Sequence, residues 1–129
     1  MEKRYYSGDV QQARAYSPVV ATQGGRILWL AGHAARQDDS GRSLAGNFEA
    51  QVRQTFANLS ATLARGGGKL QDMVTMTVFI LDSRHGDRFV EIRKEYFPEG
   101  FPASALITVA GFARPDMMVE IQGVAVVPE

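Results

Sequence analysis

The segment Phe48–Asp82 reads FEAQVRQTFANLSATLARGGGKLQDMVTMTVFILD and determines the fold prediction. In its first half, apolar residues recur every three or four positions, which is typical of a helix with one buried side. Asn47 precedes them and is a preferred residue at helix starts, whereas three glycines from Gly66 favour a helix end. The sequence therefore predicts an amphipathic helix over Phe48–Arg65. Its apolar positions are Phe48, Val52, Phe56, Leu59 and Leu63.

The second half of the segment changes to a period of two at Met73, which predicts a strand over Met73–Leu81. Neither side of this strand is strongly polar, so we expect it to be covered on both faces. The predicted helix can cover one face, and another copy of the chain is one source of the second cover. The two sides consist of Val74, Met76, Val78 and Ile80, and of Thr75, Thr77, Phe79 and Leu81.

The whole chain has 129 residues, with 14 basic residues, 14 acidic residues and no cysteine. This length predicts one domain, residues 1–129, with a core of its own. Balanced charge creates no general attraction to nucleic acid or to anionic membranes, so we expect neither as a partner. Without cysteine there is no disulfide, thiolate nucleophile or Cys-ligated metal. We find no secretory signal and no membrane-spanning apolar run, and we expect a cytoplasmic protein.

Short apolar runs on either side of the central segment predict further strands and one further helix. Glycines after Thr22 predict a hairpin turn, Gln23–Gly25, between the second and third strands. The second helix begins near Asp82 and ends before Pro98. This order of elements predicts an α/β sandwich in which two helices lie on one face of the sheet. The additional predicted strands are Lys3–Ser7, Val19–Thr22, Arg26–Ala31, Ala103–Ala110 and Met117–Val127.

Glu120 is the polar residue that most strongly indicates chemistry, because it lies within the apolar strand sequence MMVEIQGVAVV. A carboxylate is costly to bury there unless it has a partner, and burial favours the neutral acid that a general acid requires. The alternative is a sheet-edge glutamate that faces water or pairs with an arginine. His33 follows a strand end, Arg114 lies in the last turn, and Tyr16 precedes Pro18 in an irregular segment. Each of these three has an ordinary structural interpretation beside a functional one.

Several segments taken together resemble the RidA family, also called YjgF-type or Rid proteins. The helix–strand unit AQVRQTFANLSATLARGGGKLQDMVTMTVFILD matches most closely, and the likeness extends in order over nearly the whole chain. The resemblance implies a chorismate-mutase-like α/β domain with a mixed sheet, assembled as a homotrimer with clefts between neighbouring subunits. A neighbouring subunit would then cover the second face of the Met73–Leu81 strand. The other matching segments are AYSPVV (Ala15–Val20), GGRILWLAGHAA (Gly24–Ala35), the DDSG loop, RKEYF, FPA (Phe101–Ala103) and VEIQGVAV (Val119–Val126).

Members of that family with demonstrated chemistry hydrolyse reactive enamines and imines, such as 2-aminoacrylate, to a keto acid and ammonia. The resemblance implies no cofactor and no metal. It matches Glu120 to the glutamate that acts through the hydrolytic water, and Tyr16 to the tyrosine that lines the cleft. Gly32 falls at the corner that contributes backbone to the site. The family arginine that binds the substrate carboxylate follows a Pro-Ala pair, and here that position is Ser104.

The departure at Ser104 leaves two hypotheses, both with a small molecule as partner. In the first, the protein is an imine or enamine deaminase in which Glu120 is catalytic and His33 or Arg114 takes over part of the anion binding. Under this hypothesis, Ser104→Arg is expected to speed the hydrolysis of simple 2-imino acids. In the second, it is a non-catalytic ligand-binding or regulatory Rid protein without the carboxylate-binding arginine. Endoribonuclease activity, for which some relatives are labelled, is the least favoured because the charge is balanced.

Overall fold

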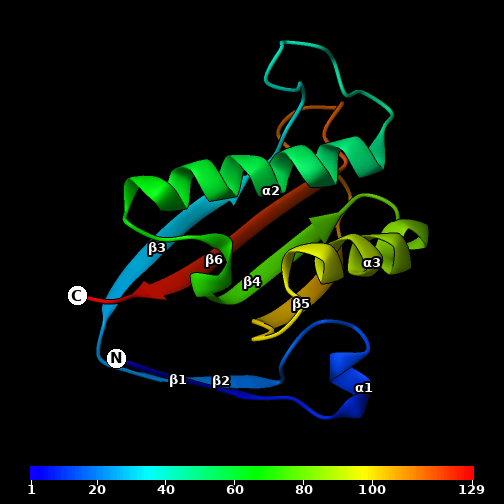
Figure 1. The fold of residues 1–129 in the computed structure, drawn as a ribbon. Helices are drawn as coiled ribbons and strands as arrows, with labels where there is room; N and C mark the ends of the chain where they lie inside the picture. The colour runs from blue at the N-terminus through cyan, green and yellow to red at the C-terminus, as the bar shows by residue number, and fades with distance from the viewer.

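The computed structural model describes residues 1–129 and contains a four-stranded sheet, a separate two-stranded sheet and helices (Figure 1). No helix is both long enough and apolar enough to cross a membrane. In chain order the elements are β1 (Glu2–Tyr6), α1 (Asp9–Gln12), β2 (Val19–Gln23), β3 (Arg26–His33), α2 (Phe48–Arg65), the 3-10 turn η1 (Leu70–Asp72), β4 (Met73–Ile80), the 3-10 turn η2 (Ser83–His85), α3 (Gly86–Tyr96), β5 (Ala103–Thr108) and β6 (Val119–Val127).

The larger sheet has the strand order β3-β6-β4-β5. β4 and β5 run parallel, whereas β6 is antiparallel to both β3 and β4, so the sheet is mixed. Figure 1 shows α2 and α3 on one face of this sheet, and the two helices contact each other. This arrangement confirms the predicted α/β fold with a mixed sheet and two helices on one face.

α2 packs on the sheet through the apolar stripe that the sequence predicts. This stripe meets the alternate residues Met76, Val78 and Ile80 of β4 in one core. Burial of each such side chain contributes about 1.5–3 kcal/mol. Asn47 caps α2 as predicted, because its side chain accepts a hydrogen bond from Ala50 N at 3.1 Å. The fully buried residues of the stripe are Val52, Phe56, Leu59 and Leu63.

Gln51, on the buried side of α2, forms hydrogen bonds that connect the helix to the segment before β6. Its side-chain nitrogen donates to the carbonyls of Leu44 and Asp116 at 3.1 and 2.8 Å, and its Oε1 accepts from Met118 N at 2.8 Å. A buried amide left unpaired would cost about 1–3 kcal/mol, so these three bonds hold the connection firmly. They fix where β6 begins, and with it the position of Glu120, the second residue of that strand.

The predicted hairpin at Gln23–Gly25 is wrong. β2 pairs with β1 and β3 pairs with β6, so the strands on either side of the glycines belong to different sheets. Gly24 and Gly25 do turn the chain at positive φ, but β2 is largely exposed whereas β3 supplies Leu30 to the core. The pairing of β3 with β6 is therefore determined by the burial of β3 residues beneath α2, and not by the turn at Gly24 and Gly25. The one-turn helix α1 also lies in a segment for which the sequence predicts no regular element.

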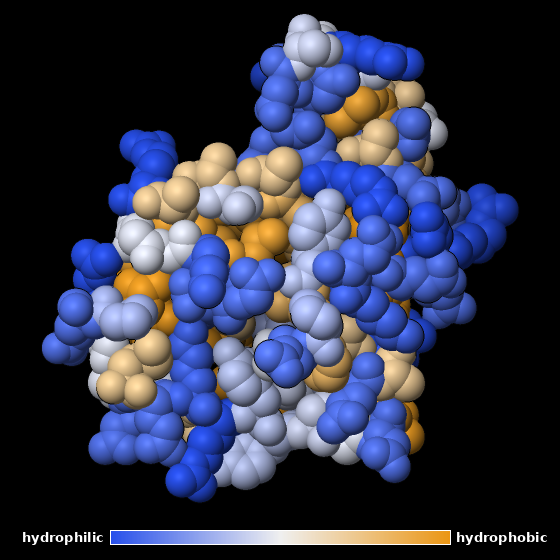
Figure 2. All heavy atoms as spheres, viewed as in Figure 1, coloured by the Kyte–Doolittle hydropathy of each residue, from blue (hydrophilic) through white to orange (hydrophobic).

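The face of the larger sheet that points away from the helices is open and exposes several large apolar side chains. Trp29 is 77% exposed, Ile27 49% and Ile107 42%, and these residues lie on the two outer strands β3 and β5. By contrast, the surface on the side of α2 and α3, which faces the viewer in Figure 2, is mainly hydrophilic. Large exposed aromatic and aliphatic side chains gathered on one sheet face are typical of an interaction surface.

We propose that this open sheet face packs against other copies of the chain in a homotrimer. Sedimentation equilibrium at micromolar concentration should give about three times the chain mass of 14.1 kDa for the natural protein. Trp29→Glu should give the monomer mass, because a charge buried without a partner costs at least about 2 kcal/mol. Lys94→Glu, an exposed position on α3, is the matched control. A monomeric natural protein would contradict the proposal.

Candidate active site

Glu120 lies in the interior of the sheet, because β6 is flanked by β3 and β4. The sheet-edge interpretation of this residue is therefore wrong. The alternative of an arginine partner also fails, since none of the eight ion pairs in the chain includes Glu120. Its side chain is half-buried on the open sheet face, across from Phe79 of β4.

The backbone of Gly32 provides the place where the Glu120 carboxylate sits. A Cβ at Gly32 would overlap Oε2 of Glu120 and lie only 3.0 Å from Cδ. Any side chain at this position would push the carboxylate away. The absence of a side chain at Gly32 is thus what allows the two residues to meet.

Glu120 lines a cavity of about 410 Å³ on the open sheet face. This volume lies within the range of about 300–1,000 Å³ that is usual for small-molecule sites. Four of the seven lining residues have apolar side chains, and the only ionisable group is the carboxylate. We call this the Glu120 cavity. Its lining residues are Phe79, Val109, Gly111, Phe112, Ala113, Glu120 and Gln122.

Tyr16 and Ser104 lie together in a second cavity, of about 320 Å³, which we call the arginine cavity. Ser104 lies beside Met76 in the β4–β5 pairing, and Met76 belongs to the core beneath the helices. The arginine cavity therefore opens at the edge strand β5 on the helix side of the sheet, whereas the Glu120 cavity is on the opposite face. Its lining residues are Arg14, Tyr16, Val90, Arg93, Ser104 and Leu106.

The segment before β2 is pinned to the start of β5, which brings Tyr16 to the arginine cavity. Ser17 is 1% exposed, its N–H donates to Pro102 O at 3.0 Å, and its hydroxyl donates to Phe101 O at 2.6 Å. Ala15, fully buried, has a φ of 57°, an uncommon conformation for a residue with a side chain. This turn allows Arg14 and Tyr16, on either side of Ala15, to line the same cavity.

Arg93 of α3 lines this cavity although, like Arg14, it is not among the site residues predicted from the sequence. It is 2% exposed, and its Nη1 donates to Ser104 Oγ at 2.7 Å while its Nη2 donates to Arg14 O at 2.9 Å. Burial and repulsion from Arg14 lower the pKa of Arg93 to about 10, so it remains cationic at neutral pH. A sequence signal existed, because Arg93 follows the buried Phe89 by four positions and so falls within the apolar stripe of α3.

His33 and Arg114 are in neither cavity. The Nδ1 of His33 donates to Ala31 O at 2.8 Å, and its Nε2 lies 2.8 Å from the hydroxyl of Thr62 on α2. Both ring nitrogens thus have partners inside the chain, and the ring is turned toward the helix side of the sheet. Arg114 is exposed and directly follows Ala113, a lining residue of the Glu120 cavity.

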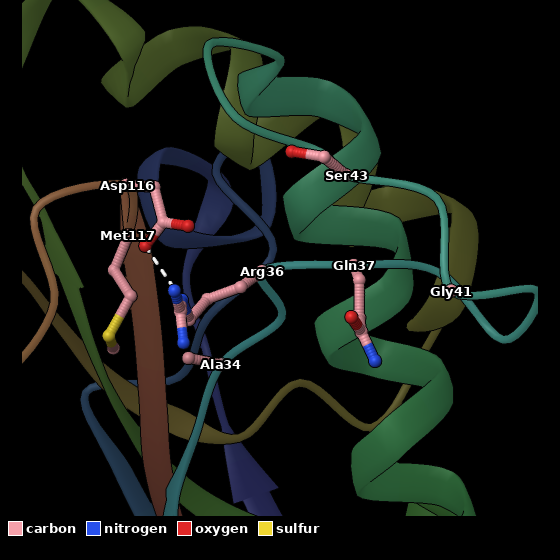
Figure 3. Close-up of a pocket in the computed structure, with 7 residues that line it drawn as sticks. All are labelled: Ala34, Arg36, Gln37, Gly41, Ser43, Asp116 and Met117. Atoms are coloured by element: carbon pink, nitrogen blue, oxygen red, sulfur yellow. Dashed lines mark hydrogen bonds and ion pairs between the residues drawn. The ribbon is translucent and has the colours of Figure 1, made fainter.

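A third and larger cavity, of about 510 Å³, lies between the 34–43 segment and the residues before β6 (Figure 3). Arg36 and Asp116 form an ion pair across it, with Nε donating at 2.7 Å. Since its two charged groups already neutralise each other, it holds no free acid or base. It contains none of the site residues predicted from the sequence.

The mixed sheet with two helices on one face, and a glutamate seated against a glycine backbone, define a RidA-like α/β protein. Residues 8–127 match the profile of the family described as Endoribonuclease L-PSP. The chain belongs to this family, which is the RidA/YjgF family.

Relatives that are named as deaminases are between 26 and 29% identical to the chain. The 3-aminoacrylate deaminase RutC of Acinetobacter baylyi is 29% identical over 107 residues, which cover 83% of the chain and 84% of the relative. The 2-iminobutanoate/2-iminopropanoate deaminase of Dermatophagoides farinae is 26% identical over 107 residues, 83% of each protein. The solved structure of the Rid-family protein YyfB from Yersinia pestis superposes with a TM-score of 0.85 at 22% identity, covering 98% of the chain and all of YyfB. That likeness shows the fold.

The contact between Gly32 and Glu120 predicts a coupled effect on stability. Gly32→Ala should lower the free energy of unfolding by about 1–3 kcal/mol, because the new methyl group meets the carboxylate. In the double variant with Glu120→Ala the obstacle is gone, so most of this cost should disappear. Urea denaturation measures all three variants, with Gly111→Ala as control, since a Cβ there meets open space. Strictly additive effects would show that the two residues do not touch.

Proposed function

We propose that this protein hydrolyses a small enamine or imine that bears a carboxylate, releasing ammonia and the corresponding oxo acid. The observation that carries the proposal is the Glu120 carboxylate, held against Gly32 in a mainly apolar cavity and free of any cation. An unpaired carboxylate in a small apolar cavity is suited to exchange protons with water and substrate. Relatives named as deaminases of 3-aminoacrylate and of 2-imino acids support the same chemistry.

The reaction consumes one water and needs only proton transfers. An enamine first takes a proton on carbon and loses one from nitrogen, which gives the imine. The oxygen of water then forms a bond to the imine carbon while the nitrogen is protonated, which gives a carbinolamine. The hydroxyl proton of this intermediate is then passed to the amino nitrogen as the C–N bond breaks, so that ammonia leaves and the C=O group forms. Glu120 relays the proton in both steps, first from the attacking water to the imine nitrogen and then from the carbinolamine hydroxyl to the leaving nitrogen.

We propose further that the two cavities combine between copies of the chain. Within one chain they lie on opposite faces of the sheet, so one small substrate cannot contact both. β5, which borders the arginine cavity, is an edge strand, and the Glu120 cavity lies on the open face. Packing the β5 edge of one copy against the open face of the next would bring the two cavities into one cleft. A repeated contact of this kind closes as a ring.

The non-catalytic alternative keeps the cleft as a ligand site without turnover. The unpaired carboxylate of Glu120 favours the enzyme over this alternative. In a pocket that only binds an anion, a second negative charge would repel the ligand and weaken binding. RNA cleavage remains the less favoured activity in spite of the family description. The chain has equal numbers of acidic and basic residues, which offers no extended basic surface for a phosphate backbone.

Replacement of the catalytic carboxylate tests the proposed function. Glu120→Gln keeps the shape of the side chain but cannot exchange protons, so kcat/KM should fall by about 10²–10⁴-fold. The assay is ammonia release from an enzymatically generated 2-imino acid, corrected for spontaneous hydrolysis. Glu91→Gln, an exposed position on α3, is the control. A natural protein that binds the oxo acid product but does not speed ammonia release would support the non-catalytic alternative instead.

A further inference from the structure

Arg93 is a buried cation without an acidic partner. Six other arginines of the chain form ion pairs with carboxylates, but the partners of Arg93 are a hydroxyl and a backbone carbonyl. Its Nε is buried and has no hydrogen-bond partner. A second cation, Arg14, is close enough to lower the pKa of Arg93 by repulsion. Burying a charge in this way is unfavourable for folding, so an anion that enters the cavity would relieve a cost already present.

The chemistry of the arginine cavity favours a small anion. Two guanidinium groups, a phenol and a hydroxyl line it, and none of its lining residues is acidic. Asp87 pairs with Arg14 at 3.1 Å, but its side chain is 88% exposed and is not part of the lining. The cavity therefore keeps one guanidinium, that of Arg93, without a counter-ion. One unbalanced positive charge matches a single carboxylate.

The hydrogen bonds of Arg93 leave donors available. A guanidinium has five N–H groups, and two of them are used on Ser104 and on the Arg14 carbonyl, so three remain. Ser104 accepts a hydrogen bond from Arg93 through Oγ, which leaves its own hydroxyl proton free to donate. Arg93 and Ser104 together can thus offer a carboxylate the charged, multiple hydrogen bonding that a serine alone cannot.

We propose that Arg93 of α3, assisted by the hydroxyl of Ser104, binds the substrate carboxylate in place of an arginine on β5. This inference rests on the proposed function, because that function supplies the carboxylate. It also changes the expectation for Ser104→Arg. A second guanidinium at that position would face Arg93 at hydrogen-bond distance, and like charges repel, so the single variant should bind carboxylates more weakly, not more tightly.

Isothermal titration calorimetry with sodium 2-oxobutanoate tests the inference without turnover. Arg93→Gln should weaken binding by about 10- to 100-fold, the effect of losing a charge-assisted hydrogen bond. Arg93→Lys keeps the charge but loses the planar guanidinium, so its affinity should lie between those of the natural protein and Arg93→Gln. Arg88→Gln, on the same helix but paired with Glu49 and Glu91, should bind as the natural protein does. The uncharged methyl 2-oxobutanoate should not bind measurably.

The exchange variant Arg93→Ser/Ser104→Arg gives the sharpest control. It moves the guanidinium to β5 and the hydroxyl to α3. If carboxylate binding requires a guanidinium beside a hydroxyl, the affinity for 2-oxobutanoate should return to within about fivefold of the natural value. It also keeps the test valid if Arg93→Gln fails to fold. Unchanged binding by Arg93→Gln, or tighter binding of inorganic phosphate than of 2-oxobutanoate, would overturn the inference.

Activity measured on the same variants separates this inference from the proposed function. If the natural protein binds 2-oxobutanoate through Arg93 but does not release ammonia from imines, the proposed function fails and the assignment of Arg93 stands. If Arg93→Gln hydrolyses imines with the natural kcat/KM, the function stands and the assignment of Arg93 is wrong.

Discussion

The structure depends on a sheet that carries large apolar side chains on both faces but is covered by its own chain on only one. On the covered face, α2 and α3 bury the alternate residues of β4 in the main core. On the other face, Trp29 and Ile107 remain exposed. Exposed apolar surface of this kind favours association, so in the proposed homotrimer the sheet that organises the fold also supplies the contact between copies. The proposed assembly and the proposed function then depend on the same sheet.

The position of each functional group follows from that sheet. Alternation along β6 places Glu120 on the open face, although its neighbours in sequence, Val119 and Ile121, are buried in the core. Alternation along β5 places Ser104 on the helix side, within reach of Arg93. The Glu120 cavity and the arginine cavity consequently lie on opposite faces of one chain. In the proposed reaction a substrate needs both an acid–base group and a carboxylate-binding group, so it would need two chains.

The features set by local periodicity could be predicted from the sequence. Patterns within single elements predict the apolar stripe of α2, the alternation of β4 and the cap at Asn47. They also single out Glu120, as a carboxylate within an apolar strand. The strand that pairs with β3 could not be predicted in this way. Gly24 and Gly25 allow a turn whichever strand β3 pairs with, and the pairing is decided by packing against α2 and β6, which lie far from β3 in the sequence. Arg93 was not predicted either, although it falls within the apolar stripe of α3, because arginines on helices are mostly exposed to solvent. Only the packing of α3 on β5 shows that it is buried beside Ser104.

The central claim is that one active site is built from two chains, and a complementation experiment tests it most directly. Glu120→Gln and Arg93→Gln proteins, each inactive alone, are unfolded together in equal amounts and allowed to reassemble. If neighbouring chains supply the two residues, random trimers contain intact sites, and ammonia release from a 2-imino acid should recover to about a quarter of the natural activity. If both residues act within one chain, no intact site can form, and a mixture no more active than its two parents would contradict the account.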